Sequence, residues 1–162
     1  MASVAAASGY SRMALYRHFG SRAGLLTALL AHVDEAEGAE TAVREILGAP
    51  TPSEMVECLV AWWAGYVPQF AGIARGVLAA KHADPDLRAA WDDRMRDLRR
   101  VCEAVADHSD VEPEARPDLA DELWVLFSVP LWIQLSDDGW DTERYQRTIT
   151  RLALAALSRQ PR

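Results

Sequence analysis

The first 33 residues contain three arginines and two histidines, and no aspartate or glutamate. Arg12, Arg17 and Arg22 give this stretch a charge of +3, so the whole-chain charge of −7 leaves −10 for the rest of the protein. Arginine, tyrosine and histidine side chains in such a cluster bind phosphate oxygens and the edges of bases. A positive segment on an acidic protein therefore predicts a surface that meets a polyanion.

A short helix from Ser11 to Phe19 is the element that must position these side chains. Ser11 is a favourable N-cap, and Gly9 supplies the left-handed residue that a turn between two helices needs. A helix of small residues, Val4–Ala7, is expected before that turn. Leu15 and Phe19 are four residues apart and are expected to face inward, which leaves the basic side chains outside. This arrangement is typical of helix-turn-helix DNA binding, in which the second helix enters the major groove.

The segment VAAASGYSRMALYRHFGSRAGLLTALL resembles the second half of the DNA-binding domain of the tetracycline-repressor-like (TetR) family. The shared features are an alanine-rich helix, a glycine turn, a serine cap, the motif Leu-Tyr-x-x-Phe and a leucine-rich helix. The resemblance covers about residues 4–33. Family members carry a further helix before this segment, and only three residues precede Val4 here. We therefore expect the DNA-binding segment to be truncated, and operator DNA to be bound well only where that first helix is present.

The resemblance also implies roles for single residues. Those expected to face base edges are Ser11, Arg12 and Met13. Those expected to contact phosphates or the wall of the groove are Tyr16, Arg17, His18 and Arg22. The alternative is that they are ordinary solvated side chains on a short helix.

Helical patterns continue to the end of the chain and strand patterns do not interrupt them, so an all-α fold is predicted. The expected helices run from Ser21 through Val43 and Leu47 to Gly48, from Thr51 to near Pro68, over residues 73–80, from Asp84 to a linker at 108–118, over 119–136 with a kink at Pro130, and onward from Asp141. We divide the chain into residues 1–34, a partial helix-turn-helix DNA-binding domain, and residues 35–162, a ligand-binding and dimerisation domain.

Bulky aromatic residues are frequent, with six tryptophans in 162 residues. Large flat side chains pack with gaps that small molecules can fill, and methionine adds an adaptable wall. The residues expected to line an effector cavity are Trp62, Trp63, Tyr66, Phe70, Met95, Leu98, Cys102, Trp124 and Phe127. Because these faces carry no charge, the expected effector is small and chiefly apolar. The alternative for each of these side chains is ordinary core packing.

The two C-terminal helices have more apolar surface than one bundle can easily hide, and a monomer rarely exposes such a patch. A two-fold interface between two copies would cover it. The residues expected in this homodimer interface are Leu131, Trp132, Ile149, Leu152 and Leu157.

Patterns for other functions are weak. Cys58 and Cys102 are isolated in apolar segments and are expected to be buried hydrophobic residues. The histidines show no zinc-like spacing with other ligand residues, so neither metal nor cofactor is expected. The adjacent aspartates at 92–93 and 137–138 do not share a helix face, and no catalytic residues or enzyme activity are expected. Because the sequence contains neither a long apolar run nor a signal peptide pattern, we expect a cytoplasmic protein without a membrane partner.

Together these observations predict a DNA-binding transcriptional regulator of the TetR type, expected to be an effector-responsive repressor. As the resemblance implies, an effector would shift the spacing of two recognition helices in the homodimer. The alternative hypothesis is a stand-alone helical protein that binds ligand or dimerises and has lost DNA binding.

Overall fold

All regular secondary structure in residues 6 and 9–158, the part of the chain that the computed structural model describes, is helical, and no strand occurs among them. The elements are α2 (Arg12–Phe19), α3 (Arg22–Ala36), α4 (Ala39–Leu47), α5 (Pro52–Ala80), α6 (Pro85–Asp107), the 3-10 helix η1 (Pro113–Ala115), α7 (Arg116–Leu126), α8 (Val129–Asp137) and α9 (Thr142–Leu157). The predicted all-α fold is confirmed. The helix expected over residues 4–7 falls outside the described residues except for Ala6, which is helical.

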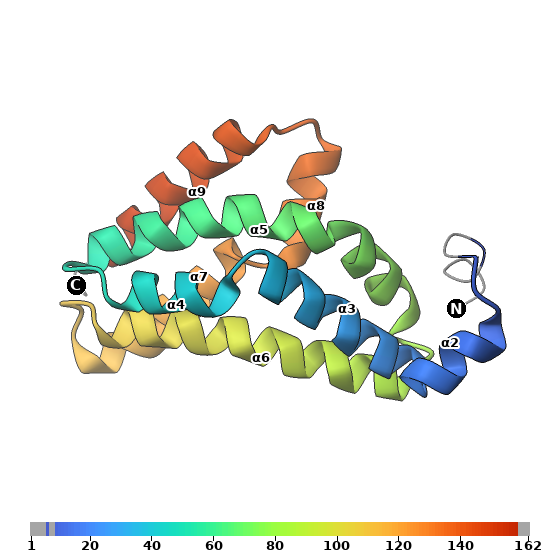
Figure 1. The fold of residues 1–162 in the computed structure, drawn as a ribbon. Coiled ribbons are helices and arrows are strands. Elements are labelled where there is room, and N and C mark those ends of the chain that lie inside the picture. Colours follow the sequence, from blue (N-terminus) through green and yellow to red (C-terminus); the bar gives the residue numbers. More distant parts are fainter. Residues whose placement is uncertain (1–5, 7–8, 159–162) are drawn as a thin grey trace.

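Helix α5 is the centre of the bundle. It contributes fully buried side chains along its length, among them Val56, Leu59, Val60 and Val67. Figure 1 shows α9 on one side of α5, and α4 and α6 on the other. Helix α7 packs against both α6 and α9. Helix α2 lies at one end of the molecule, where α3 connects it to the bundle and runs beside α6.

Side-chain caps set the first turns of several helices where the sequence predicts them. In each case a side-chain oxygen accepts a hydrogen bond from a backbone N–H three residues later, which satisfies a donor that the helix itself leaves free. The capping residues, with the oxygen to nitrogen distances, are Ser11 (3.1 Å), Ser21 (3.0 Å), Thr51 (3.2 Å), Asp84 (3.1 Å) and Asp141 (2.7 Å). These predicted starts are confirmed.

Two expected helix boundaries in the first half of the chain are wrong. The helix from Ser21 does not continue to Leu47, because Gly38 has a φ of 61° and separates α3 from α4. Conversely, α5 passes through Pro68 to Ala80 as one helix of 29 residues, where two helices were expected. Proline removes a backbone hydrogen bond at a cost of about 3 kcal/mol. Burial of its neighbours, such as Val67 and Phe70, favours continuation, and α5 bends along its course (Figure 1).

The helix expected over residues 119–136 is likewise two helices. Helix α7 ends at Leu126 and α8 begins at Val129, so Phe127 and Ser128 separate them. The hydroxyl of Ser128 accepts a hydrogen bond from the backbone N–H of Leu131 at 3.4 Å and caps α8. Pro130 therefore lies in the first turn of a helix, where its missing N–H would have no partner, and not at a kink.

The cysteines differ from each other. Cys102 is completely buried in the core, as expected, but Cys58 is exposed on α5, so the expectation that both are buried is wrong. Burial raises the pKa of the Cys102 thiol to about 12, because a thiolate would lose its hydration. In the described part of the chain, no helix combines the length and the apolar character needed to cross a membrane.

Candidate DNA-binding helix and ligand cavity

Helix α2 presents the predicted DNA-facing side chains to solvent. Leu15 is buried with 6% of its surface accessible, which confirms its inward orientation, whereas Met13 is 82% exposed. Arg12 and Arg17 are exposed, and neither forms a hydrogen bond or ion pair with another described residue. The remaining members of the predicted set, Ser11, Tyr16, His18 and Arg22, are also exposed. The helix thus offers unpaired positive charge at one end of the molecule (Figure 1).

Arg22 differs from the other two arginines because it has a partner. Its Nη1 atom lies 3.6 Å from Oδ2 of Asp84, the residue that caps α6. The Arg22 side chain is still 53% exposed. An exposed pair at this distance is weak, so Arg22 can exchange Asp84 for another anion at little cost.

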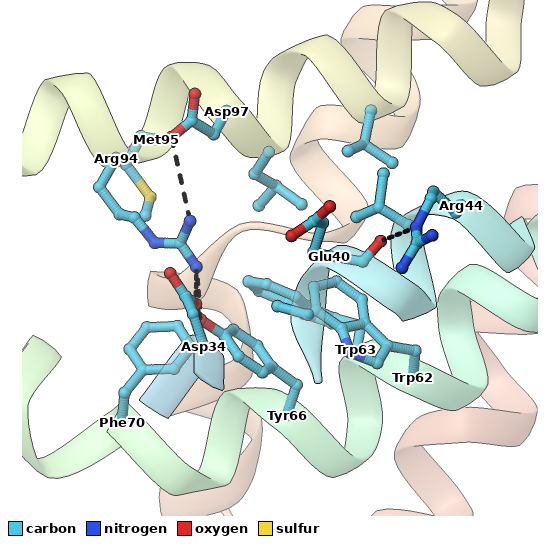
Figure 2. A pocket seen from close by; sticks show the side chains of 14 residues that line it. Asp34, Glu40, Arg44, Trp62, Trp63, Tyr66, Phe70, Arg94, Met95 and Asp97 are labelled. Atoms are coloured by element: carbon cyan, nitrogen blue, oxygen red, sulfur yellow. Dashed lines mark hydrogen bonds and ion pairs between the residues drawn. The ribbon is translucent and has the colours of Figure 1, made fainter. Parts of the chain in front are cut away.

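A cavity of about 460 Å³ lies between α4, α5 and α6, with the end of α3 in its wall. Figure 2 shows aromatic side chains of α5 on one side and the side chains of α6 opposite them. Trp62 and Tyr66 are stacked with ring centroids 4.6 Å apart, and Tyr66 and Phe70 lie 5.1 Å apart. The volume and the aromatic lining fit a small organic molecule.

Six of the nine residues predicted to bind an effector line this cavity together: Trp62, Trp63, Tyr66, Phe70, Met95 and Leu98. The other three do not line it. Cys102 and Phe127 are fully buried in the core, and Trp124 is half-buried and packs against that core. For these three residues the structure agrees with the alternative of ordinary core packing.

Three polar side chains from three helices meet in the cavity wall. Arg94 of α6 donates a hydrogen bond from Nη2 to Oδ1 of Asp34 of α3 at 2.6 Å. The hydroxyl of Tyr66 donates to the same Oδ1 atom and accepts from Nη2 of Arg94. Burial raises the pKa of Tyr66 above its usual range, and the hydrogen bond to Asp34 adds to this effect. We define Asp34, Tyr66 and Arg94 as the polar cluster.

The expectation of an uncharged cavity wall is wrong. Besides Asp34 and Arg94, the charged residues Glu40, Arg44 and Asp97 line the cavity. In Figure 2 the Glu40 carboxylate points toward the space above the tryptophans. The guanidinium of Arg44 is held by its own helix, since its Nη2 atom donates to Thr41 Oγ1 at 3.0 Å.

Neither Arg94 nor Asp34 was among the residues predicted from the sequence to line the cavity. A signal for Arg94 was present, because it lies four residues before Leu98 and therefore shares a face with this cavity residue. Asp34 offered no comparable signal, since its partner is 60 positions away in the chain. The remaining lining residues that sequence reasoning missed are Ala39, Val43 and Val101.

The residues predicted for a dimer interface occupy different environments in the single chain. Ile149 is 1% exposed and belongs to the core, where α9 packs on α5, so it has no surface to offer. Leu152 is 38% exposed. Leu131, Trp132 and Leu157 are half-buried. Val125, which was not predicted, is 61% exposed on α7.

Comparison with known proteins bears on the N-terminal segment. A family model described as "Bacterial regulatory proteins, tetR family" matches residues 1–29, which include α2 and the start of α3. Neither the curated proteins nor the solved structures contain a match to the chain. The match, together with the exposed basic helix, defines a DNA-binding transcriptional regulator. Over residues 1–29 the chain is therefore similar to the DNA-binding segment of TetR-family regulators.

Proposed function

We propose that this protein is a transcriptional repressor that releases DNA when a small, mostly apolar effector enters the α4–α5–α6 cavity. One observation carries the proposal: α3 joins the two sites. At its first residue, Arg22, it follows α2, and near its last turn it places Asp34 in the cavity wall. A molecule that alters the packing around Asp34 therefore acts on the helix that holds the DNA-facing segment.

In this proposal α2 is the recognition helix. Ser11, Arg12 and Met13 face base edges at its start, and Tyr16, Arg17, His18 and Arg22 contact the phosphates. Its exposed and unpaired arginines support these roles, because each arginine–phosphate contact releases counterions from the DNA.

We further propose that two copies form a homodimer through the apolar faces near α8 and α9. Exposed or half-buried side chains such as Leu152, Trp132 and Val125 support this arrangement. A dimer would place two copies of α2 on a pseudo-palindromic operator, whose half-sites mirror the two-fold symmetry.

The experiment starts from duplexes selected from a random DNA library with the full chain, followed by titrations at increasing salt concentration. We expect affinity to fall steeply with salt. Arg17→Gln should weaken binding to all sequences and lower the salt slope by about one, whereas Arg12→Gln should change the selected sequence. Arg96→Gln, which removes an exposed arginine from α6, outside the proposed dimer interface, is the matched control and should change neither property. Selection that yields no bound DNA, both with this chain and with a chain extended by an N-terminal helix, would contradict the role in DNA binding.

A further inference from the structure

Arg94 and Tyr66 form a receptor for a carboxylate, and the structure shows it occupied. Nη2 of Arg94 and the hydroxyl of Tyr66 both donate to a single carboxylate oxygen, Oδ1 of Asp34. Both donors lie in the cavity wall, and Figure 2 shows Asp34 seated between them. The carboxylate that fills this receptor belongs to the protein itself.

The receptor is open to exchange. The Arg94 side chain is 23% exposed and that of Asp34 is 31% exposed, so both are within reach of a molecule in the cavity. Nη1 of Arg94 has no hydrogen-bond partner in the described part of the chain, and its ion-pair contact with Oδ2 of Asp97 is long, at 4.0 Å. The guanidinium therefore has donors left for an incoming oxygen atom.

Exchange of one carboxylate for another keeps Arg94 paired with an anion. A partly buried guanidinium needs an anionic partner, and its planar fork suits carboxylate oxygens better than any neutral acceptor. A ligand carboxylate would replace Asp34 on Arg94, and Asp34 is exposed enough to take up water instead. A neutral ligand would leave the ion pair intact, and a cation would be repelled by Arg94 and would pair with Glu40 or Asp97 instead.

The aromatic side chains next to Arg94 indicate the chemistry of the rest of the effector. Trp62, Tyr66 and Phe70 present rings along one side of the cavity, directly adjoining the polar cluster (Figure 2). Such a surface favours a flat apolar body. We propose that the effector is an organic acid with an aromatic body, and that its carboxylate takes Arg94 and the hydroxyl of Tyr66 from Asp34.

This inference rests on the proposed function and specifies the chemical class of its effector. Asp34 belongs to α3, so its release removes an ion pair that ties α3 to α6. The apolar body of the ligand provides binding energy, whereas its carboxylate breaks the ion pair between Asp34 and Arg94. An acid should therefore act on α3, and a neutral molecule of the same shape should fill the cavity with little effect on α3.

The test is calorimetric titration of the full chain with three probes that share one ring system: 1-naphthoate, 1-naphthalenemethanol and 1-naphthylmethylammonium. We expect 1-naphthoate to bind most tightly. Asp34→Asn keeps the size of the side chain and removes the competing charge, so it should raise the affinity for 1-naphthoate by about tenfold and leave that for the alcohol unchanged. Arg94→Gln should abolish the preference for the acid. Arg96→Gln, an exposed arginine of α6 outside the cavity, is the matched control.

Equal binding of acid and alcohol, with no effect of Arg94→Gln or Asp34→Asn, would overturn the inference and leave the cavity as an effector site. Preference for the ammonium probe that Glu40→Gln removes would replace the acid by a cation. If no probe binds, both this inference and the proposed effector site are contradicted, while DNA binding is measured separately. Thermal melts of each variant show whether it is folded, and Asp34→Asn tests the receptor even if Arg94→Gln does not fold.

Discussion

Arg22 of α3 pairs with Asp84, which caps α6, and the same two helices pair again at the cavity through Asp34 and Arg94. The polarity is reversed between the two contacts: α3 supplies the arginine at the end next to α2 and the aspartate at the cavity. The earlier residue of α3 contacts the start of α6, and the later residue of α3 contacts a later residue of α6. The two helices therefore run side by side in parallel (Figure 1). A displacement of α3 along α6 would therefore alter both contacts.

The pairing of Arg22 predicts that Asp84 competes with DNA. Asp84→Asn removes the competing charge, and asparagine still caps the helix well. We expect this variant to bind duplexes of any sequence about two- to threefold more tightly, because Arg22 becomes free for a phosphate. Fluorescence anisotropy with a labelled duplex measures the change. Asp86→Asn, an exposed residue in the first turn of α6, is the control, and equal gains in the two variants would argue against a role for the ion pair.

Because Leu152 is exposed, a substitution there should prevent dimer formation without unfolding the chain. Leu152→Arg places a charge in the proposed interface and should convert the dimer to a monomer of 17.9 kDa while the chain stays folded. Ile149→Ala instead leaves a cavity in the core and should cost about 2–5 kcal/mol of unfolding free energy. Sedimentation equilibrium and urea denaturation measure the two effects. A monomeric unmodified chain at micromolar concentration would refute the proposed dimer.

The two cysteines predict unequal reactivity. Because only the thiolate is nucleophilic, Cys102 should resist thiol reagents, since burial raises its pKa to about 12 and also blocks access. Cys58 is exposed and should react readily. Mass spectrometry of the native chain after brief alkylation should find a single modified site, and denaturant should make both react. Early modification of Cys102 in the native chain would show that the core around α6 opens.

Gly38 predicts a site where alanine destabilises the fold. Its φ of 61° lies in the left-handed region, where a Cβ atom costs about 1 kcal/mol. Gly76 in α5 is the opposite case, because a Cβ there meets no atom within 4 Å and the backbone is helical. Urea denaturation should thus show a loss of about 1 kcal/mol for Gly38→Ala and a gain of about 0.5–1 kcal/mol for Gly76→Ala. Similar effects of the two substitutions would contradict a structural need for the glycine at position 38.

The starts of five capped helices and the basic character of α2 are determined by the sequence itself. A cap such as Ser11 or Asp141 bonds to a backbone N–H three residues away, so its partner is always within the same short segment. The exposure of the arginines in α2 follows from a local pattern as well, because Leu15 and Phe19, four residues apart, mark the face that turns inward. The same holds for the aromatic row on α5, whose spacing brings its rings to one face.

The continuity of the helices and the polar cluster are decided by tertiary structure. Pro68 would end a helix in isolation. In the folded chain, burial of its neighbours stabilises the helix on both sides, so α5 continues through it. This packing energy comes from other helices and cannot be read from the local sequence. Asp34 and Arg94 each look like ordinary solvated residues in their own helices. They acquire a shared role because folding brings together two charges 60 positions apart, in a cavity where a guanidinium needs a partner.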